Sequence, residues 1–208
     1  MSENIKVLVF AKAPVAGQVK TRLIPLLGAQ GAAQLQEKLV RHALTTVQSA
    51  KLGTVELWCA PELEHVFFQQ CAREYGVSLH TQSAGNLGQR MQYAFEQSLQ
   101  TVQHAVLIGS DCPALGAVDL RHAATLLKQD DDAVFCPAED GGYVLIALAR
   151  TSPQLFQGVE WGSGQVMAQT RERLQMLNWR WQEMPMLWDV DRPEDYQRLA
   201  ALADWHHS

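Results

Sequence analysis

The sequence predicts an α/β protein, a three-layer α/β/α sandwich built around a mostly parallel mixed sheet. Short apolar runs with the character of strands alternate with longer segments of helical periodicity along almost the whole chain. Strands that alternate with helices pair in parallel through right-handed crossovers. The first run, Ile5–Ala11, is apolar except for Lys6, as is typical of a strand buried on both faces of such a sheet.

The remaining elements are predicted in order from the same two signals. The apolar runs predict strands at Val55–Ala60, Val77–Thr81, Ala105–Gly109, Ala133–Cys136 and Tyr143–Ala149, and an alternating edge strand at Trp179–Met184. The helical segments are Gly28–Ala50, Pro61 to near Gly76, Leu87–Val102, Val118–Lys128, Ser163–Leu177 and Pro193–Ala203. Only the strands within residues 133–149, which a short turn joins, are predicted to be antiparallel.

Length and composition predict one compact domain over residues 1–208. The chain has 208 residues, of which 47% are hydrophobic, and this is enough for one buried core. A net charge of −5 and a pI near 5.8 argue against a broad attraction to nucleic acid. The apolar runs are far shorter than the roughly 20 residues of a membrane helix, and residues 1–6 lack the features of a secretory signal. We therefore expect a cytoplasmic protein that binds neither nucleic acid nor membranes.

The cysteines and the tryptophans of the edge strand are interpreted as structural residues. Cys59, Cys71, Cys112 and Cys136 are scattered, without the close pairs of a zinc site or the setting of a disulfide framework. Their reduced state fits the cytoplasm. The alternating tryptophans of Trp179–Met184 suit either the core or the contact surface of a homodimer.

A cluster of cations follows the first predicted strand. In open α/β sheets, ligands bind outside the carboxyl ends of the strands. Lys12, Lys20 and Arg22 lie there in one loop, and Gly17 gives its backbone freedom. Such a loop suits a polyphosphate. It is not a P-loop, because that motif requires glycines where this chain has Pro14 and Val19. A solvated surface loop is the alternative.

Carboxylates follow two later strands. Asp111 comes directly after Ala105–Gly109, where it is well placed to hold Mg²⁺ or Mn²⁺ through oxygen. A second acid, Asp191, lies between the last strand and the last helix and could join Asp111 in one metal site. Each acid also has a structural explanation. Asp111 could form a turn or a helix cap, and Asp191 could cap the helix that begins at Pro193.

A third acidic segment, Glu139-Asp140-Gly141-Gly142, joins the two antiparallel strands. Asp-Gly is a standard signal for a hairpin turn, so the segment has an ordinary structural explanation. In the functional interpretation the glycines allow close approach of the backbone to a ligand, and Glu139 or Asp140 contacts an acceptor hydroxyl. Asp140 is then the first candidate for a catalytic base.

These segments together resemble a bacterial family of GT-A-like transferases. The resemblance rests on K-x-P-x-x-G-x-x-K-T-R-L from Lys12, G-S-D-C-P-x-L from Gly109, E-D-G-G-Y from Glu139 and D-V-D-x-P-E-D-Y from Asp189, with further matches at residues 85–91 and 161–163. Members are known as glycosyltransferases, some linked to arsenosugar biosynthesis and radical-SAM gene neighbourhoods. The first and last motifs also resemble the MobA-like nucleotidyltransferases, among them the guanylyltransferase of coenzyme F420 synthesis.

The resemblance implies a role for each matching segment. Lys12, Lys20 and Arg22 would bind phosphates, with Asp111 as the principal metal ligand and Asp191 as the second. The nucleotide or acceptor pocket would be lined by Gly85, Asn86, Gly88 and Arg90. The acceptor side would be formed by Glu139, Asp140, Gly141, Gly142 and Trp161. The chain departs from the family at Asn86, where relatives carry Asp, and at Gly109, where a glycosyltransferase D-x-D motif has an acid.

Three functions agree with these residues. The first is metal-dependent glycosyl transfer from a nucleoside-diphosphate sugar to a small-molecule acceptor, in which the metal stabilises the departing diphosphate. The second is nucleotidyl transfer from a nucleoside triphosphate with release of pyrophosphate, which Gly109 favours. The third is a non-catalytic module that binds nucleotides and regulates a partner.

Overall fold

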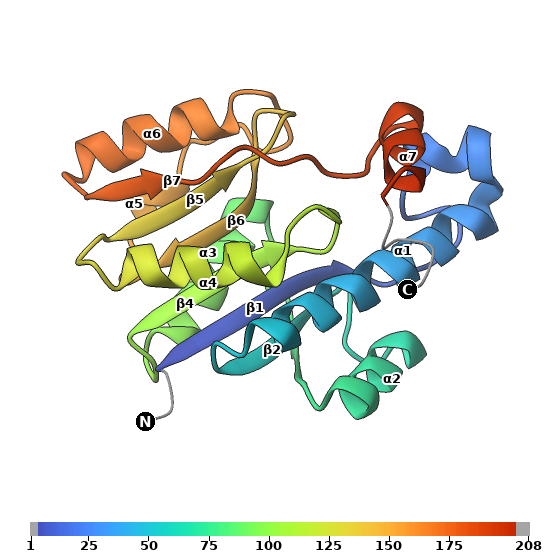
Figure 1. The fold of residues 1–208 in the computed structure, drawn as a ribbon, viewed down its shortest axis with the longest axis horizontal. Coiled ribbons are helices and arrows are strands. Elements are labelled where there is room, and N and C mark those ends of the chain that lie inside the picture. Colours follow the sequence, from blue (N-terminus) through green and yellow to red (C-terminus); the bar gives the residue numbers. More distant parts are fainter. Residues whose placement is uncertain (1–3, 203–208) are drawn as a thin grey trace.

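The computed structural model describes residues 4–202, and the strands within this range form one seven-stranded sheet in the order β3-β2-β1-β4-β6-β5-β7 (Figure 1). The strands are β1 (Ile5–Lys12), β2 (Thr54–Ala60), β3 (Ser78–Thr81), β4 (His104–Gly109), β5 (Ala133–Pro137), β6 (Tyr143–Leu148) and β7 (Trp181–Glu183). Only β6 runs antiparallel to its neighbours, β4 and β5, among the described strands. The predicted mixed, mostly parallel sheet is confirmed.

Helices cover both faces of this sheet. They are the 3-10 turn η1 (Thr21–Leu23), α1 (Ile24–Ala50), α2 (Val66–Tyr75), α3 (Leu87–Ser98), α4 (Ala117–Leu127), α5 (Pro153–Phe156), α6 (Val166–Met176) and α7 (Pro193–Ala200). One core joins the sheet to α1, α2 and α4, and a second core on the other face joins it to α3, α5 and α6. The predicted three-layer sandwich is therefore confirmed. None of the helices in residues 4–202 has the length and apolar character to span a membrane.

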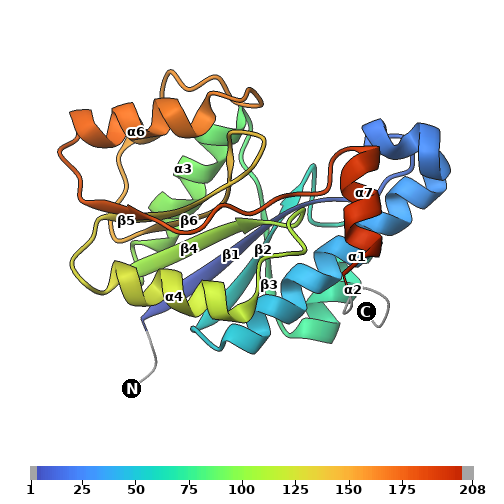
Figure 2. The same cartoon turned by 45° about the horizontal axis from the view of Figure 1, so that its top comes forward.

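The last helix, α7, belongs to neither face. It packs beside the first turns of α1 (Figure 2), in a small core that contains Leu23, Leu39, Trp188 and Leu199. The chain reaches it along an extended segment that passes the end of β4, where Val190 N donates to Asp111 O at 2.8 Å. This path brings the segment after β7 to the carboxyl ends of β1 and β4.

Several element boundaries differ from those predicted. The helix predicted from Pro61 begins at Val66, because the His65 ring accepts a hydrogen bond from Phe67 N and caps it there. The first helix begins four residues before Gly28, whose backbone departs from helical geometry at φ 70° and kinks it. The last helix is capped at Arg192 rather than Asp191 and ends at Ala200. Its predicted end, Ala203, lies outside the described residues.

An internal ion pair fixes the register of β1 and β2 away from the carboxyl edge. Lys6 Nζ lies 2.7 Å from Glu56 Oε1, and the two side chains are 20% and 5% exposed. Glu56 also accepts a hydrogen bond from Trp58 Nε1 at 3.1 Å. A buried charge that loses its partner is strongly destabilising, whereas the pair as a whole contributes little.

We predict that Lys6→Met lowers the free energy of unfolding by about 3 kcal/mol, because it removes the close counter-charge of the buried Glu56 carboxylate and leaves it the more distant His80 ring, whose Nε2 lies 3.8 Å from Glu56 Oε1. Urea denaturation measures this value. Adding Glu56→Gln, which still accepts from Trp58, should recover most of the loss. A double variant less stable than Lys6→Met alone would contradict the interpretation.

Candidate functional site

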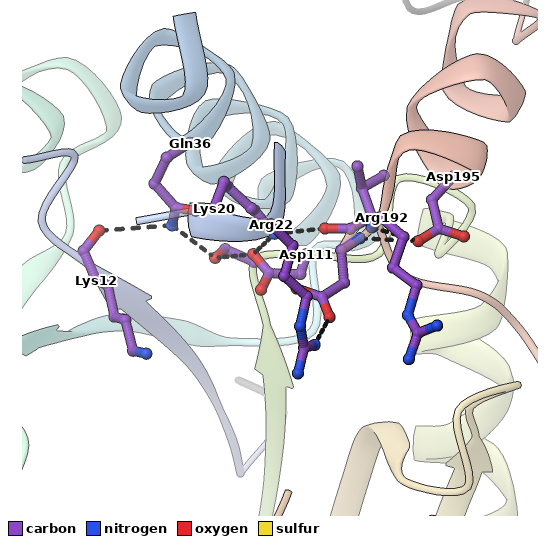
Figure 3. Close-up of polar contacts among 10 residues, drawn as sticks. Lys12, Lys20, Arg22, Gln36, Asp111, Arg192 and Asp195 are labelled. Carbon is purple, nitrogen blue, oxygen red and sulfur yellow. Dashed lines mark hydrogen bonds and ion pairs between the residues drawn. The ribbon is translucent and has the colours of Figure 1, made fainter. Parts of the chain in front are cut away.

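The ammonium group of Lys20 joins three segments that follow three different strands. Lys20 Nζ lies 2.9 Å from Asp111 Oδ1, after β4, and donates to Val190 O at 2.7 Å, after β7 (Figure 3). Its side chain is only 4% exposed. The backbone of Lys20 is left-handed, at φ 48° and ψ 40°, a conformation that costs a lysine free energy. The loop is therefore held in an unfavourable backbone geometry that directs its cation at Asp111 and Val190.

A second set of contacts supports Asp111 from the side of α1. Ser110 Oγ donates to Asp111 Oδ1 at 3.1 Å, and Gln36 Nε2 donates to Ser110 Oγ at 3.3 Å. Gln36 Nε2 also lies 3.5 Å from Lys12 O. The contacts of the Asp111 carboxylate with Lys20 and Ser110 both involve Oδ1, so Oδ2 takes part in neither.

The predicted phosphate-binding cations surround one cavity of about 460 Å³. Lys12, Lys20, Arg22 and Arg90 line it together with Asp111 and Asp191. Arg22 forms an ion pair with Asp191, and both side chains are largely exposed. Figure 3 shows Lys12 at the end of β1, with its ammonium group directed away from Gln36. The structure thus brings four cations and both predicted metal-binding acids to one hollow at the carboxyl edge.

A smaller cavity of about 250 Å³ lies on the other side of Asp111. Its lining includes Asp111, Asp140 and Asp189, with Tyr143 and Trp161 as aromatic walls. A third hollow, of about 330 Å³, is lined by Arg22, Asp140, Asp189 and Asp191 among others, so all three share residues. The candidate site is a continuous cleft that is basic at one end and acidic at the other.

Two glycines let loops approach the small cavity more closely than other residues would. A Cβ at Gly88, in the first turn of α3, would lie 2.5 Å from ring atoms of Trp161. At Gly141, where φ is +90°, a Cβ would overlap the carbonyl of Gly164. The turn 139–142, the loop 161–164 and α3 are therefore packed together around the cavity.

Asp189 experiences a strongly unfavourable environment for its charge. Burial and, next to it, the negative charges of Asp140 and Asp111 together raise the pKa of its carboxyl from the ordinary 3.8 to about 6, against a smaller opposing effect of Lys20. Burial also raises the pKa of the Tyr143 hydroxyl, which therefore stays protonated. Three carboxylates thus act on one another across the small cavity.

These carboxylates could hold a hard cation. No group of three His, Cys, Asp or Glu side chains within residues 4–202 lies close enough to form a complete metal cage. Mg²⁺, however, is commonly bound through one or two carboxylates, with water and substrate phosphates completing its coordination. Asp111 and Asp189 fit that requirement, since they lie beside the cationic cavity and repel each other without a cation.

Other predicted residues have different surroundings. Glu139 is paired with Arg198 at 2.8 Å, and Asn86 caps α3 by accepting from Gln89 N at 3.0 Å. Gly17 and Gly85 occupy left-handed turns, at φ +82° and +106°. With Gly88 and Gly141, they shape the loops without lining either the cationic or the small cavity. Gly142 and Trp161 do line the small one.

Sequence reasoning missed three residues of the site. Asp189 belongs to a segment that we singled out, but Asp191 was chosen as the acid there. Gln36 is 3% exposed on an otherwise apolar helix face, and a polar residue in that stripe is the signal that could have identified it. Val190 acts through its backbone, for which side-chain identity gives no signal.

Comparisons with known proteins agree with this architecture. Residues 32–163, more than half of the chain, match the model of a family described as "Uncharacterized protein conserved in bacteria (DUF2064)". A protein from Desulfovibrio desulfuricans G20, provisionally assigned as a nucleotide-diphospho-sugar transferase, is 27% identical with a TM-score of 0.88, over 100% of this chain and 92% of that one. No curated protein matches the chain.

Two more distant solved structures share the fold. A cytidylyltransferase from Leptospira borgpetersenii serovar Hardjo-bovis is 16% identical with a TM-score of 0.60, over 96% of this chain and 85% of that chain. Rv0371c from Mycobacterium tuberculosis H37Rv, in complex with manganese, is 15% identical with a TM-score of 0.58, over 95% of this chain and 99% of its own. Proteins that share this fold therefore include a cytidylyltransferase and a protein whose structure was solved with manganese.

Removing the charge of Asp189 should stabilise the metal-free protein above pH 6. Its folded-state pKa is raised, so the unfolded state binds fewer protons between about pH 4 and pH 6. Wild-type stability therefore falls as the pH rises through this window, and the loss persists above it. Asp189→Asn should gain on the order of 1 kcal/mol at pH 8 and little at pH 4. Urea denaturation in EDTA measures the gain in stability at each pH. Equal gains at pH 4 and pH 8 would contradict the raised pKa of Asp189.

Proposed function

This chain belongs to the DUF2064 family of bacterial proteins, and we propose that it is a divalent-metal-dependent glycosyltransferase that uses a nucleoside-diphosphate sugar. The proposal takes residues 1–208 as one transferase domain that acts in the cytoplasm. The provisional assignment of the Desulfovibrio protein and the sequence resemblance to glycosyltransferases support this choice of donor. The link to arsenosugar biosynthesis is part of the same proposal.

One observation carries the proposal: four cations converge on one cavity that also contains Asp111. Lys12, Lys20 and Arg22 come from one loop, whereas Arg90 comes from α3, and a merely solvated loop would not be held against that helix. Four positive charges in one hollow of an acidic protein suit a ligand with several negative charges. A diphosphate is such a ligand.

In the proposed mechanism the cationic cavity holds the diphosphate and the small cavity holds the acceptor. Arg22 and Arg90 bind phosphate oxygens, and Lys20 keeps the Asp111 carboxylate in position between the two cavities. Asp111 and Asp189 would hold Mg²⁺ or Mn²⁺, which would supply positive charge to stabilise the departing diphosphate. Asp140, which lines the small cavity, accepts the proton of the acceptor hydroxyl.

Nucleotidyl transfer is the second candidate. Gly109 stands where a D-x-D motif would place an acid, and the fold is shared with a cytidylyltransferase. In this reaction the same cations would hold the pyrophosphate that leaves when an acceptor oxygen attacks the α-phosphorus.

Thermal denaturation with Mg²⁺ or Mn²⁺ and a panel of nucleotides tests the function. A ligand at a hundredfold excess over its Kd should raise the stability by about 2.7 kcal/mol. Stabilisation by nucleoside-diphosphate sugars, with release of the diphosphate, supports glycosyl transfer. Stabilisation by triphosphates, with release of pyrophosphate, favours the second candidate. Binding without turnover of any acceptor would favour a regulatory module.

We predict that Asp111→Ala loses metal-dependent nucleotide binding, because it removes the proposed metal ligand. The fold should be retained at lower stability, because the buried Lys20 ammonium loses its counter-charge but keeps its hydrogen bond to Val190 O. Calorimetric titration with and without Mg²⁺ measures the binding, and circular dichroism checks the fold. Normal metal-dependent binding by this variant would remove Asp111 from the site.

Arg22→Met should weaken binding of nucleoside diphosphates about tenfold and leave binding of the nucleoside unchanged, because it removes one charge-assisted contact to phosphate. The matched control is Arg73→Met, which removes an exposed arginine of α2, on another part of the surface. Equal effects of the two substitutions would indicate a general charge effect rather than a phosphate site.

A further inference from the structure

The small cavity beside Asp111 differs from the cationic cavity in the sign of its charge. Asp111, Asp140 and Asp189 provide its charged lining, and none of the described residues that line it is a Lys, Arg or His. The rest of the wall is mainly apolar, with Leu87, Tyr143 and Trp161 as its largest members. A ligand that enters it meets acids, hydrocarbon and the hydroxyls of Tyr143 and Ser163.

The cations near this cavity are either paired or outnumbered by acids. Arg192 lines the adjoining hollow together with five carboxylates, among them Asp140 and Asp189. Lys20 lies against Asp111 and Val190 O with its side chain 4% exposed. Arg198 is paired with Glu139, and it stacks 4.4 Å from the ring centroid of Trp188. Arg22 is paired with Asp191. Three carboxylates outnumber the single Lys20 ammonium, so the cavity without a metal repels an anionic ligand. With one divalent cation bound these charges balance, and no net positive charge remains to attract an anion.

The polar groups of the cavity also determine which hydrogen bonds a ligand must make. Ionised carboxylates only accept hydrogen bonds, so their partner has to donate O–H or N–H. A phosphate ester near neutral pH offers almost only acceptors. A neutral polyol has donors on every carbon and an apolar C–H face.

The aromatic wall that would contact the C–H face of a polyol is fixed in place by its neighbours. The Trp161 ring lies edge-to-face with Tyr143, at 6.4 Å and 89°, and nearly parallel to Phe156, at 6.5 Å and 28°. Its Nε1 is buried without a hydrogen-bond partner among the described residues, in contact with Gly88. Packing rather than hydrogen bonding therefore fixes the ring beside the acids.

We infer that this cavity binds an uncharged, hydroxyl-rich acceptor and excludes phosphorylated or carboxylated ones. The inference rests on the proposed transferase function and deepens it by naming the class of acceptor. It also separates the two candidate reactions: a phosphate or sugar-phosphate nucleophile, as in nucleotidyl transfer to a phosphate, finds no Lys, Arg or His side chain among the described residues that line the cavity.

A cysteine introduced at Ser163 can report the charge of the cavity without knowledge of the substrate. Ser163 lines the cavity, and Ser163→Cys changes one atom. The four native cysteines are buried, and burial raises the pKa of Cys59, Cys112 and Cys136 to about 12 and that of Cys71 to about 11, so their background reaction is slow. The probes are methanethiosulfonates that carry a trimethylammonium or a sulfonate group, applied in EDTA, where the carboxylates of the cavity outnumber Lys20.

We compare the rate of modification by the cationic reagent with the rate by the anionic one. This ratio should be at least about tenfold higher for Ser163→Cys than for Ser49→Cys. Ser49 is an exposed residue near the end of α1 and serves as the matched control. A normalised ratio near one, or a faster anionic reagent, would overturn the inference. Nucleotide binding by the same variants is measured separately, so failure of the transferase proposal remains distinguishable.

Protection of Ser163→Cys from a neutral methanethiosulfonate then tests the class of ligand. The probes are matched pairs, glycerol with glycerol 3-phosphate and methyl glucosides with glucose 6-phosphate, in the presence of Mg²⁺ and a nucleoside diphosphate. We expect protection by at least one neutral member and by none of the phosphate esters. Protection by a phosphate ester, or by no neutral member, would overturn the inference.

Discussion

The candidate site depends on the contacts of one buried ammonium group. Lys20 is held by Asp111 and by the carbonyl of Val190, and the amide of Val190 in turn donates to the carbonyl of Asp111. This triangle joins the loops that follow β1, β4 and β7. A buried cation requires such partners, because leaving it unpaired would cost several kcal/mol. The contacts that stabilise the carboxyl edge of the sheet are therefore the same contacts that assemble the site.

The triangle also divides the cleft by charge. Lys12, Arg22 and Arg90 remain on one side of Asp111, around a cavity large enough for a diphosphate. Asp140 and Asp189 lie on the other side, against the aromatic wall. A transferase needs such a division, because its donor carries the negative charge and its acceptor carries the nucleophile. A metal ion between the two sides would offset the repulsion among the carboxylates.

The sequence predicted the layers, the strands and the convergence of Lys20, Arg22, Asp111 and Asp191, because buried strands and the ends of parallel strands leave a periodic signal. It did not identify Asp189, since only the tertiary structure shows that the chain turns Asp189 toward the small cavity and Asp191 toward the cationic one. The pairing of Asp191 with Arg22 and the backbone role of Val190 likewise depend on tertiary geometry. The short helix α5 was also not predicted; it has only four residues.

The central claim is that the three loops form one metal-assisted phosphate site, and paramagnetic relaxation by Mn²⁺ tests it most directly. With a nucleoside diphosphate bound, Mn²⁺ should broaden the backbone amide signals of residues 18–22, 109–112 and 188–191 together, and Asp111→Ala should abolish this broadening. Broadening centred elsewhere, such as the groove between α1 and α2, or broadening unaffected by Asp111→Ala, would contradict the account.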